Sequence, residues 1–256
     1  MSLQQFLPLL SVLDQDEHIS TIPPLDRDHK FYWIFRNIDF KQWSSAKSSQ
    51  VLLLSGPPER RIYQVSSYIA GQEKNTALSV DHFVLYFFCS AAGRATVANV
   101  VHTLLKQIVC CSSIDKRTPI IRTFLSSLVQ RASAAEANYE WNDQGFNNEG
   151  SQLERIRKLL NAPANHLFTA LSAVLDGEKQ RCLFIIIDGL DKFEHQRDDF
   201  IREIRIFIDH LQRRTSKVKV LLTSRPLAEI KDRFSGLPCI EPDKERKGRS
   251  MPMPIM

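Results

Sequence analysis

Four short runs of apolar residues alternate along the chain with segments in which apolar residues recur every three or four positions. Short apolar runs between turn-forming residues are typical of buried strands, and the three-to-four spacing is typical of amphipathic helices. The predicted strands are Val51–Leu54, His82–Cys89, Cys182–Ile187 and Val218–Thr223. Strands that alternate with helices form mainly parallel sheets covered on both faces, so the sequence predicts an α/β fold.

Helical periodicity defines the segments between these strands. The predicted helices are about Glu59–Ala70, Thr96–Cys111, Pro119–Ala135, Gln152–Leu160, Asn165–Leu175 and Arg197–Arg213, with a short one ending at Phe234. The first should end near Gly71, because glycine weakens a helix. The polar, asparagine-rich stretch Ala137–Ser151 is predicted to be a long loop.

Aromatic residues are concentrated before the first strand, at near-helical spacing between Leu25 and Trp43. They are Phe31, Tyr32, Trp33, Phe35, Phe40 and Trp43. A helix packed on a core explains this stripe better than a platform that stacks nucleic-acid bases. We interpret Ser44–Gln50 as a polar linker and residues 1–24 as an N-terminal lead-in.

Two carboxylates follow the most apolar strand, in the sequence L-F-I-I-I-D-G-L-D-K-F. A buried strand that ends in Asp188 and Asp191 brings both to the carboxyl edge of a parallel sheet, where open α/β folds bind ligands. Asp188 stands where P-loop enzymes hold Mg²⁺ through water. If the site were active, Asp191 and Glu194 would be its catalytic candidates, although Lys192 occupies the position of a further acid. The alternative is that Asp188 simply caps the next helix.

A phosphate loop of the form G-x-x-x-x-G-K-[ST] should follow an earlier strand, and the only candidate begins at Gly56. Alignment on Gly56 places Arg61 at the second glycine, Ile62 at the lysine and Tyr63 at the hydroxyl position. Two prolines in this loop have no N–H to donate, and Ile62 carries no charge. The sequence therefore predicts weak or no binding of ATP or ADP with Mg²⁺.

Two loop arginines leave open a rescue of nucleotide binding, and a third arginine is a separate candidate contact. Arg60 and Arg61 lie in the loop, where a helix N-terminus still favours anions. A guanidinium is bulkier than a lysine ammonium and does not simply replace it, so solvated surface charge is the preferred interpretation. Arg225 follows the last predicted strand, where it could contact a terminal phosphate. The candidate nucleotide contacts are thus Gly56, Arg60, Arg61, Tyr63 and Arg225, with Asp188 as the metal ligand.

Five strings carry a resemblance to a known family. In order they are F-Y-W-I-F-R-N-I-D-F-K-Q-W, F-V-L-Y-F-F-C-S, A-T-V-A-N-V-V-H-T-L-L-K-Q-I, I-I-I-D-G-L-D-K-F and V-L-L-T-S-R-P. Over about Leu25–Ile230 the chain resembles the NACHT-type (STAND) P-loop NTPases, specifically the fungal proteins similar to the nephrocystin-3-like N-terminal domain. The sequence departs from that pattern at Gly56, as a degenerate Walker A loop.

The resemblance implies a P-loop fold with strand order 5-1-4-3-2, in which the Val218 strand lies between the Val51 and Cys182 strands. It also implies an ATP/ADP switch that drives assembly through downstream domains. We expect the NACHT-like domain to span residues 25–236. Residues 237–256 should form a disordered basic tail, so the arm that would transmit the switch is expected to be absent.

Composition argues against several other functional classes, namely metal-binding, nucleic-acid-binding and membrane proteins. The chain has 43% hydrophobic and 25% charged residues and a net charge of +5, much of it in the tail. Five cysteines without metal spacing, Cys110 and Cys111 among them, suggest buried thiols in a reducing compartment. Scattered histidines argue against a metal site, and nothing accompanies the basic tail that would favour nucleic acid. No apolar run reaches the ~20 residues that cross a bilayer. We expect a cytoplasmic protein without membrane contact.

Three functional hypotheses follow. The first is a degenerate, truncated NACHT-like domain that acts as a non-catalytic interaction or regulatory module, with protein partners such as intact relatives or a second copy. The second is an ATP/ADP-dependent switch with weak NTPase activity, in which Arg60 or Arg61 replaces the missing lysine. The third is a relic without selected function.

Overall fold

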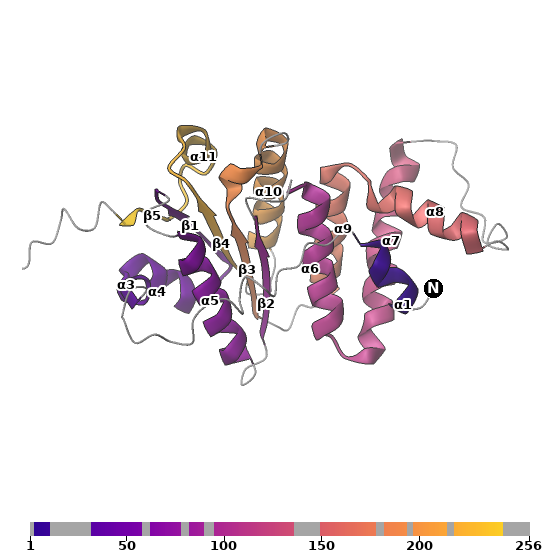
Figure 1. Ribbon diagram of the computed structural model, residues 1–256, viewed down its shortest axis with the longest axis horizontal. Coiled ribbons are helices and arrows are strands. Elements are labelled where there is room, and N and C mark those ends of the chain that lie inside the picture. The colour runs from indigo at the N-terminus through magenta and orange to yellow at the C-terminus, as the bar shows by residue number, and fades with distance from the viewer. Residues whose placement is uncertain are drawn as a thin grey trace, which may run out of the picture.

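A single five-stranded sheet, entirely parallel, forms the centre of the molecule (Figure 1). The computed structural model describes residues 3–10, 32–57, 62–77, 82–89, 95–135, 149–177, 182–193, 197–213 and 218–242. The strands are β1 (Gln50–Ser55), β2 (His82–Phe88), β3 (Cys182–Asp188), β4 (Val218–Ser224) and β5 (Cys239–Ile240). Their spatial order, β2-β3-β4-β1-β5, confirms the predicted 5-1-4-3-2 topology and the α/β fold.

Strands β1 to β4 contribute side chains to two separate cores. In β3, Leu183, Ile185 and Ile187 belong to the larger core, whereas Phe184 and Ile186 belong to the smaller one. Successive side chains of a strand point to opposite faces of the sheet. Because both faces are buried, the strands read in the sequence as continuous apolar runs.

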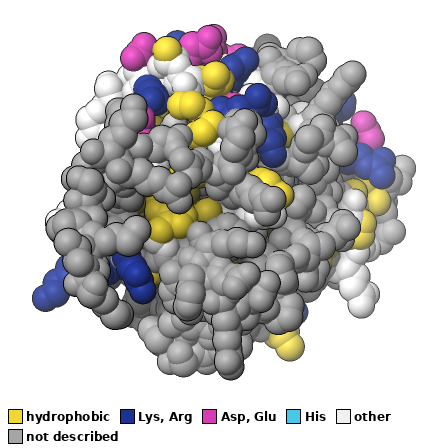
Figure 2. Space-filling view, turned by 60° about the vertical axis from the view of Figure 1, so that its left-hand side comes forward, with side chains coloured by type: hydrophobic (Ala, Val, Ile, Leu, Met, Phe, Trp, Pro, Cys, Tyr) yellow, Lys and Arg dark blue, Asp and Glu magenta, His cyan; other side chains and the backbone are white. Residues whose placement is uncertain are grey.

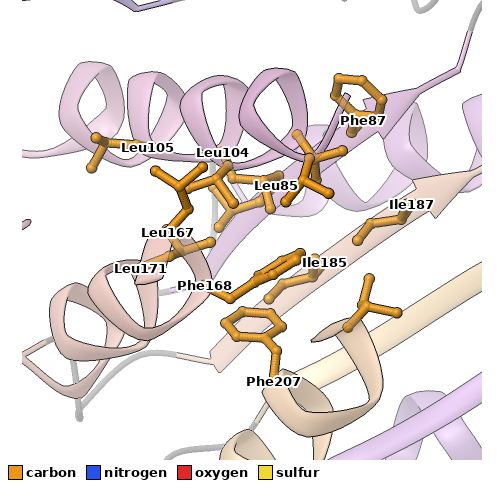
Figure 3. Close-up of a cluster of buried hydrophobic side chains, with 14 of the residues drawn as sticks. Leu85, Phe87, Leu104, Leu105, Leu167, Phe168, Leu171, Ile185, Ile187 and Phe207 are labelled. Atoms are coloured by element: carbon orange, nitrogen blue, oxygen red, sulfur yellow. The ribbon is translucent and has the colours of Figure 1, made fainter. Parts of the chain in front are cut away.

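The larger core lies under α6 (Val97–Cys111), α9 (Ala164–Gly177) and α10 (Arg197–Gln212). Helices α7 (Ile114–Ala135) and α8 (Glu149–Leu160) lie outside them (Figure 1). Figure 3 shows strand residues such as Ile185 and Ile187 meeting Leu104 of α6, Phe168 of α9 and Phe207 of α10. This face therefore carries most of the hydrophobic burial.

Three short elements complete the larger core. Helix α1 (Leu3–Phe6) and the 3-10 helix η1 (Leu7–Leu9) bring in Phe6 and Leu10, and α11 (Ala228–Arg233) brings in Ile230. The segment assigned to a lead-in is thus partly integrated into the domain. Residues 11–31 lie outside the described part of the chain.

The smaller core lies under α3 (Tyr32–Arg36), α4 (Ile38–Ser45) and α5 (Ile62–Ala77). Phe40 and Trp43 are buried there, and the Trp43 ring meets that of Phe184 at 5.9 Å, which confirms the core interpretation for these aromatics. The stripe forms two helices instead of one, because Asn37 leaves the helical conformation and its Oδ1 accepts the Phe40 N–H at 2.8 Å.

The predicted polar linker is anchored to the central strand. Lys219 of β4 is buried, and its Nζ donates to the carbonyl oxygens of Ala46 (2.6 Å) and Ser48 (3.0 Å). The Val218 N–H donates to Ser49 Oγ at 3.1 Å. A buried ammonium is stable only when its donors are satisfied, so these carbonyls hold the segment against the sheet.

Several predicted boundaries were wrong. Helix α5 continues through Gly71 to Ala77, and α7 begins five residues before Pro119. A single Gly or Pro costs about 1 or 3 kcal/mol in a helix interior, which packing of the rest of the helix can outweigh. Helix α8 begins at Glu149, inside the predicted loop, whose residues 137–148 are outside the described ranges. Strand β5 falls within residues 237–256, so the sheet extends into the segment assigned to the tail.

Candidate functional site

The site residues lie at the carboxyl ends of β1, β3 and β4, which meet at one edge of the sheet because the strands are parallel. Gly56 follows β1, Asp188 ends β3 and Arg225 follows β4. The structure therefore brings together the Gly56, Asp188 and Arg225 segments that the sequence selected separately. Arg60, Arg61 and Glu194 lie outside the described residues.

Asp188 is buried and its Oδ1 accepts two side-chain hydrogen bonds. Ser66 Oγ of α5 and Thr223 Oγ1 of β4 each donate to it at 2.7 Å. Thr223 Oγ1 in turn accepts the Gly189 N–H at 2.9 Å. Burial raises the pKa of Asp188, and the hydrogen bonds from Thr223 and Ser66 and the charge of Lys192 only partly offset it.

Ser66 is a site residue that sequence reasoning missed. It lies three residues after Tyr63, hence on the next turn of α5, and is fully buried. Its Oγ is also 2.9 Å from the Tyr63 carbonyl oxygen. The Ser66 hydroxyl thus has two acceptors within reach, Asp188 Oδ1 and the Tyr63 carbonyl oxygen, and its single proton is directed to one of them at a time. The only sequence signal was a serine on the apolar face of a helix.

Asp191 and Arg225 form a clamp between the ends of β3 and β4. Asp191 lies in the 3-10 helix η4 (Leu190–Lys192), and its carboxylate accepts the backbone N–H of Arg225 at 3.0 Å and its Nε–H at 2.6 Å. The Asp191 side chain is 5% exposed, whereas that of Arg225 is 57% exposed. The guanidinium is therefore tied to the sheet edge by its neighbour.

A glycine and a lysine fix the turn between Asp188 and Asp191. Gly189 has φ +81°, a conformation that strongly favours glycine, and a Cβ there would lie 3.2 Å from Cys89 Cβ. Lys192 donates through Nζ to the Cys89 carbonyl oxygen at 2.6 Å. Lys192 thus ties the turn after β3 to the end of β2.

The phosphate-loop half of the site is apolar where it is described. A Cβ on Gly56 would lie 3.0 Å from Ile62 Cδ1 and 3.5 Å from Pro242 Cδ. Ile62 is 7% exposed and shares the smaller core with Ile240. Tyr63 is 52% exposed, and its hydroxyl accepts a hydrogen bond from Gln64 Nε2 at 3.0 Å. The Ile62 side chain therefore packs beside Gly56.

A comparison with models of known protein families shows to which family the chain belongs. The family model described as nephrocystin 3, N-terminal, matches residues 30–225, more than half of the chain. The chain belongs to this family. The match runs from before α3 to Arg225 and so includes both halves of the site. No curated protein matches the chain.

In this nephrocystin 3 N-terminal family member, the described residues provide part of what a magnesium-bound nucleotide needs. Asp188 and Ser66 are oxygen donors of the kind Mg²⁺ binds, and α5 presents its N-terminus beside Gly56. However, Ile62 supplies no charge, the Asp188 oxygen already accepts two hydrogen bonds, and Arg225 is held by Asp191. As arranged, these residues do not fit a magnesium-bound triphosphate.

The thiols of this family member differ from expectation. Cys89 is buried as predicted, and burial raises its pKa, but Cys110 and Cys111 are exposed, so the prediction that they are buried was wrong. The core positions of α6 end at Val109, which leaves the two thiols at the helix end. Within the described ranges, no group of three or more His, Cys, Asp and Glu side chains could hold a metal ion.

The described surface mixes charges of both signs. Figure 2 shows basic and acidic side chains close together at the top of that view. Near α11, Lys231 pairs with Glu241 at 3.0 Å and Arg197 with Glu229 at 3.6 Å. Helices long and apolar enough to span a bilayer are absent from the part of the chain that the structure describes.

Proposed function

We propose that this nephrocystin 3 N-terminal domain acts as a non-catalytic interaction or regulatory module that binds protein partners, such as intact relatives or a second copy. The packing of Ile62 on Gly56 is the observation that supports this most directly. A triphosphate needs a cation and open backbone N–H groups at this place. Here the position that would supply the cation instead contributes to the core.

The second candidate is an ATP/ADP-dependent switch with weak NTPase activity. It is favoured by the carboxylates Asp188 and Asp191 and by the N-terminus of α5, a 16-residue helix, at the sheet edge. In this hypothesis Arg60 or Arg61 supplies the missing positive charge, and Arg225 leaves Asp191 to contact a phosphate. Rearrangement of Ile62 would then have to accompany binding.

Calorimetric titration with Mg-ATP and Mg-ADP separates these candidates. For the natural chain we expect no binding tighter than about 1 mM, which corresponds to about −4 kcal/mol. Micromolar binding that is lost in Asp188→Asn would overturn the proposal and support the switch. The matched pair Arg60→Gln and Arg61→Gln then identifies the rescuing charge, and a cooperative urea transition for each variant excludes misfolding.

Sedimentation velocity tests the interaction role directly. A domain that associates without nucleotide control should form the same species with and without Mg-ATP. A monomer that assembles only after Mg-ATP is added would contradict the proposal. The Ile62→Lys variant serves as a reference in which the loop regains a cation while the carboxylates stay unchanged.

A further inference from the structure

The tip of the α6–α7 hairpin combines nucleophilic, apolar and basic side chains. Helix α6 ends with the exposed pair Cys110 and Cys111, and α7 begins three residues later at Ile114. Ile114 is 81% exposed, the highest value among the described large hydrophobic residues. Because α6 follows the carboxyl end of β2, its own C-terminus lies at the opposite edge of the sheet from the candidate nucleotide site (Figure 1).

Hydrogen bonds hold this tip in a defined conformation. Ser112 caps α6 through its N–H and Oγ, which donate to the Ile108 carbonyl oxygen at 3.0 and 2.7 Å. Arg117 of α7 reaches back and donates to the carbonyl oxygens of Ser112 (3.1 Å) and Cys110 (3.3 Å). The exposure of Ile114 and of the two thiols is therefore built into the hairpin.

Basic residues flank the two thiols in the sequence of the hairpin. Lys106 lies one helical turn before Cys110 on the same face of α6, and it is exposed. Lys116 and Arg117 follow Ile114, and Asp115 is the single acid in residues 106–117, a net charge of +2. Clustered cations beside an exposed apolar side chain are attracted to anionic phospholipid headgroups.

We propose that Cys110 and Cys111 are sites of reversible S-acylation that attach the hairpin tip to an anionic membrane surface. The co-reactant is a long-chain acyl-coenzyme A. The cysteine sulfur forms a thioester bond with the acyl carbonyl carbon, the bond from that carbon to the coenzyme A sulfur breaks, and coenzyme A leaves as a thiol with the cysteine proton. Hydrolysis of the thioester by water restores the cysteine.

Two neighbouring thiols suit this modification better than they suit a disulfide. Successive side chains on an α-helix diverge by about 100°, whereas a disulfide needs Cβ atoms about 4 Å apart. Two acyl chains also meet the requirement for stable anchoring, because a single chain binds a bilayer only marginally. The inference does not depend on the proposed function, since it concerns the opposite edge of the sheet.

Metabolic labelling tests the modification. The full chain is expressed in yeast with an alkyne-bearing palmitate analogue, and hydroxylamine-sensitive label is mapped by mass spectrometry. We expect label on Cys110 and Cys111 and its loss in Cys110→Ser/Cys111→Ser. Cys239 is the matched control, because it is also exposed but lies in β5, away from Ile114. Absence of thioester-linked label, or equal labelling of Cys239, would refute the proposal.

Flotation with vesicles tests the membrane surface. Protein acylated with palmitoyl-coenzyme A should bind phosphatidylcholine vesicles containing phosphatidylserine more tightly than pure phosphatidylcholine vesicles. Lys106→Gln and Lys116→Gln should each weaken binding to the anionic vesicles by about fivefold. Equal binding of both variants to both kinds of vesicle would show that these cations have no such role.

Discussion

The two halves of the strand-end site differ in their chemistry. At the carboxylate half, Asp188, Ser66 and Thr223 are joined by short buried hydrogen bonds, whereas at the loop half the buried Ile62 side chain packs beside Gly56. Loss of one member of a buried polar network leaves its partners unsatisfied, which costs about 1–3 kcal/mol per group. The Ile62 side chain has no hydrogen-bond partner to leave unsatisfied and stabilises the fold by its burial. Stability alone can therefore account for the hydrogen-bonded carboxylate half and for the apolar loop half.

Truncation of Ile62 should have the largest effect. Ile62→Ala removes a buried side chain that packs on Gly56 and should lower the free energy of unfolding by about 2–4 kcal/mol, whereas Ile62→Val should cost about 1 kcal/mol. Urea denaturation measures both values. If Ile62→Ala lowered the free energy of unfolding by less than Ile62→Val does, the loop half would not be part of the core.

Removal of the Asp188 carboxylate should come next. Asp188→Ala leaves the Thr223 hydroxyl without its acceptor and leaves Ser66 with the Tyr63 carbonyl oxygen alone, and it should cost about 2–3 kcal/mol. Asp188→Asn keeps an acceptor and should cost about 1 kcal/mol. Urea denaturation measures the free energy of unfolding of both variants. Equal losses of stability would show that the carboxylate does not stabilise the fold through its hydrogen bonds.

A smaller loss is expected for the turn that positions Asp191. Gly189→Ala combines a positive φ with a Cβ contact at 3.2 Å and should cost about 2 kcal/mol. Gly236 is a matched control, because it has φ +85° but open space around it, and Gly236→Ala should cost about 1 kcal/mol. Thermal unfolding distinguishes them. Identical shifts in Tm would assign the whole effect to backbone conformation.

The Arg225 clamp should contribute less. Arg225→Gln removes the 2.6 Å contact with Asp191 but leaves the backbone N–H bond, and the guanidinium is more than half exposed. We expect a loss of at most about 1 kcal/mol, which salt should reduce. Denaturant titrations at low and high ionic strength check this. A loss that salt does not change would point to packing of the arginine stem instead.

The smallest effect should be a pH dependence. Because the folded-state pKa of Asp188 is raised above 3.8, its contribution to stability is full below that value and declines as the pH rises toward the folded-state pKa. Asp188→Asn should therefore cost more at pH 4 than at pH 7, as urea midpoints would show. The opposite order would mean that the carboxylate is stabilised in its charged form.

Local sequence pattern predicted the sheet but not the hydrogen bonds that join its edge. Apolar runs in the sequence predicted the positions of four strands, and the family resemblance predicted their order in the sheet. Both predictions depend on whole segments and not on single side-chain contacts. The two-residue strand β5 is too short to show periodicity. Ser66 was missed because its role depends on β3, which is 122 residues away in the sequence. The exposure of Cys110 could not be derived either, since it depends on where α7 turns back.

From its sequence, the segment around Ala46 resembles a flexible linker between two secondary-structure elements. In the fold, the Lys219 ammonium and the Ser49 hydroxyl fasten it to the first residues of the central strand. Mechanical tension applied to α4 would therefore not be absorbed by an extensible tether. It would pass directly into β4, the strand that ends beside Asp188.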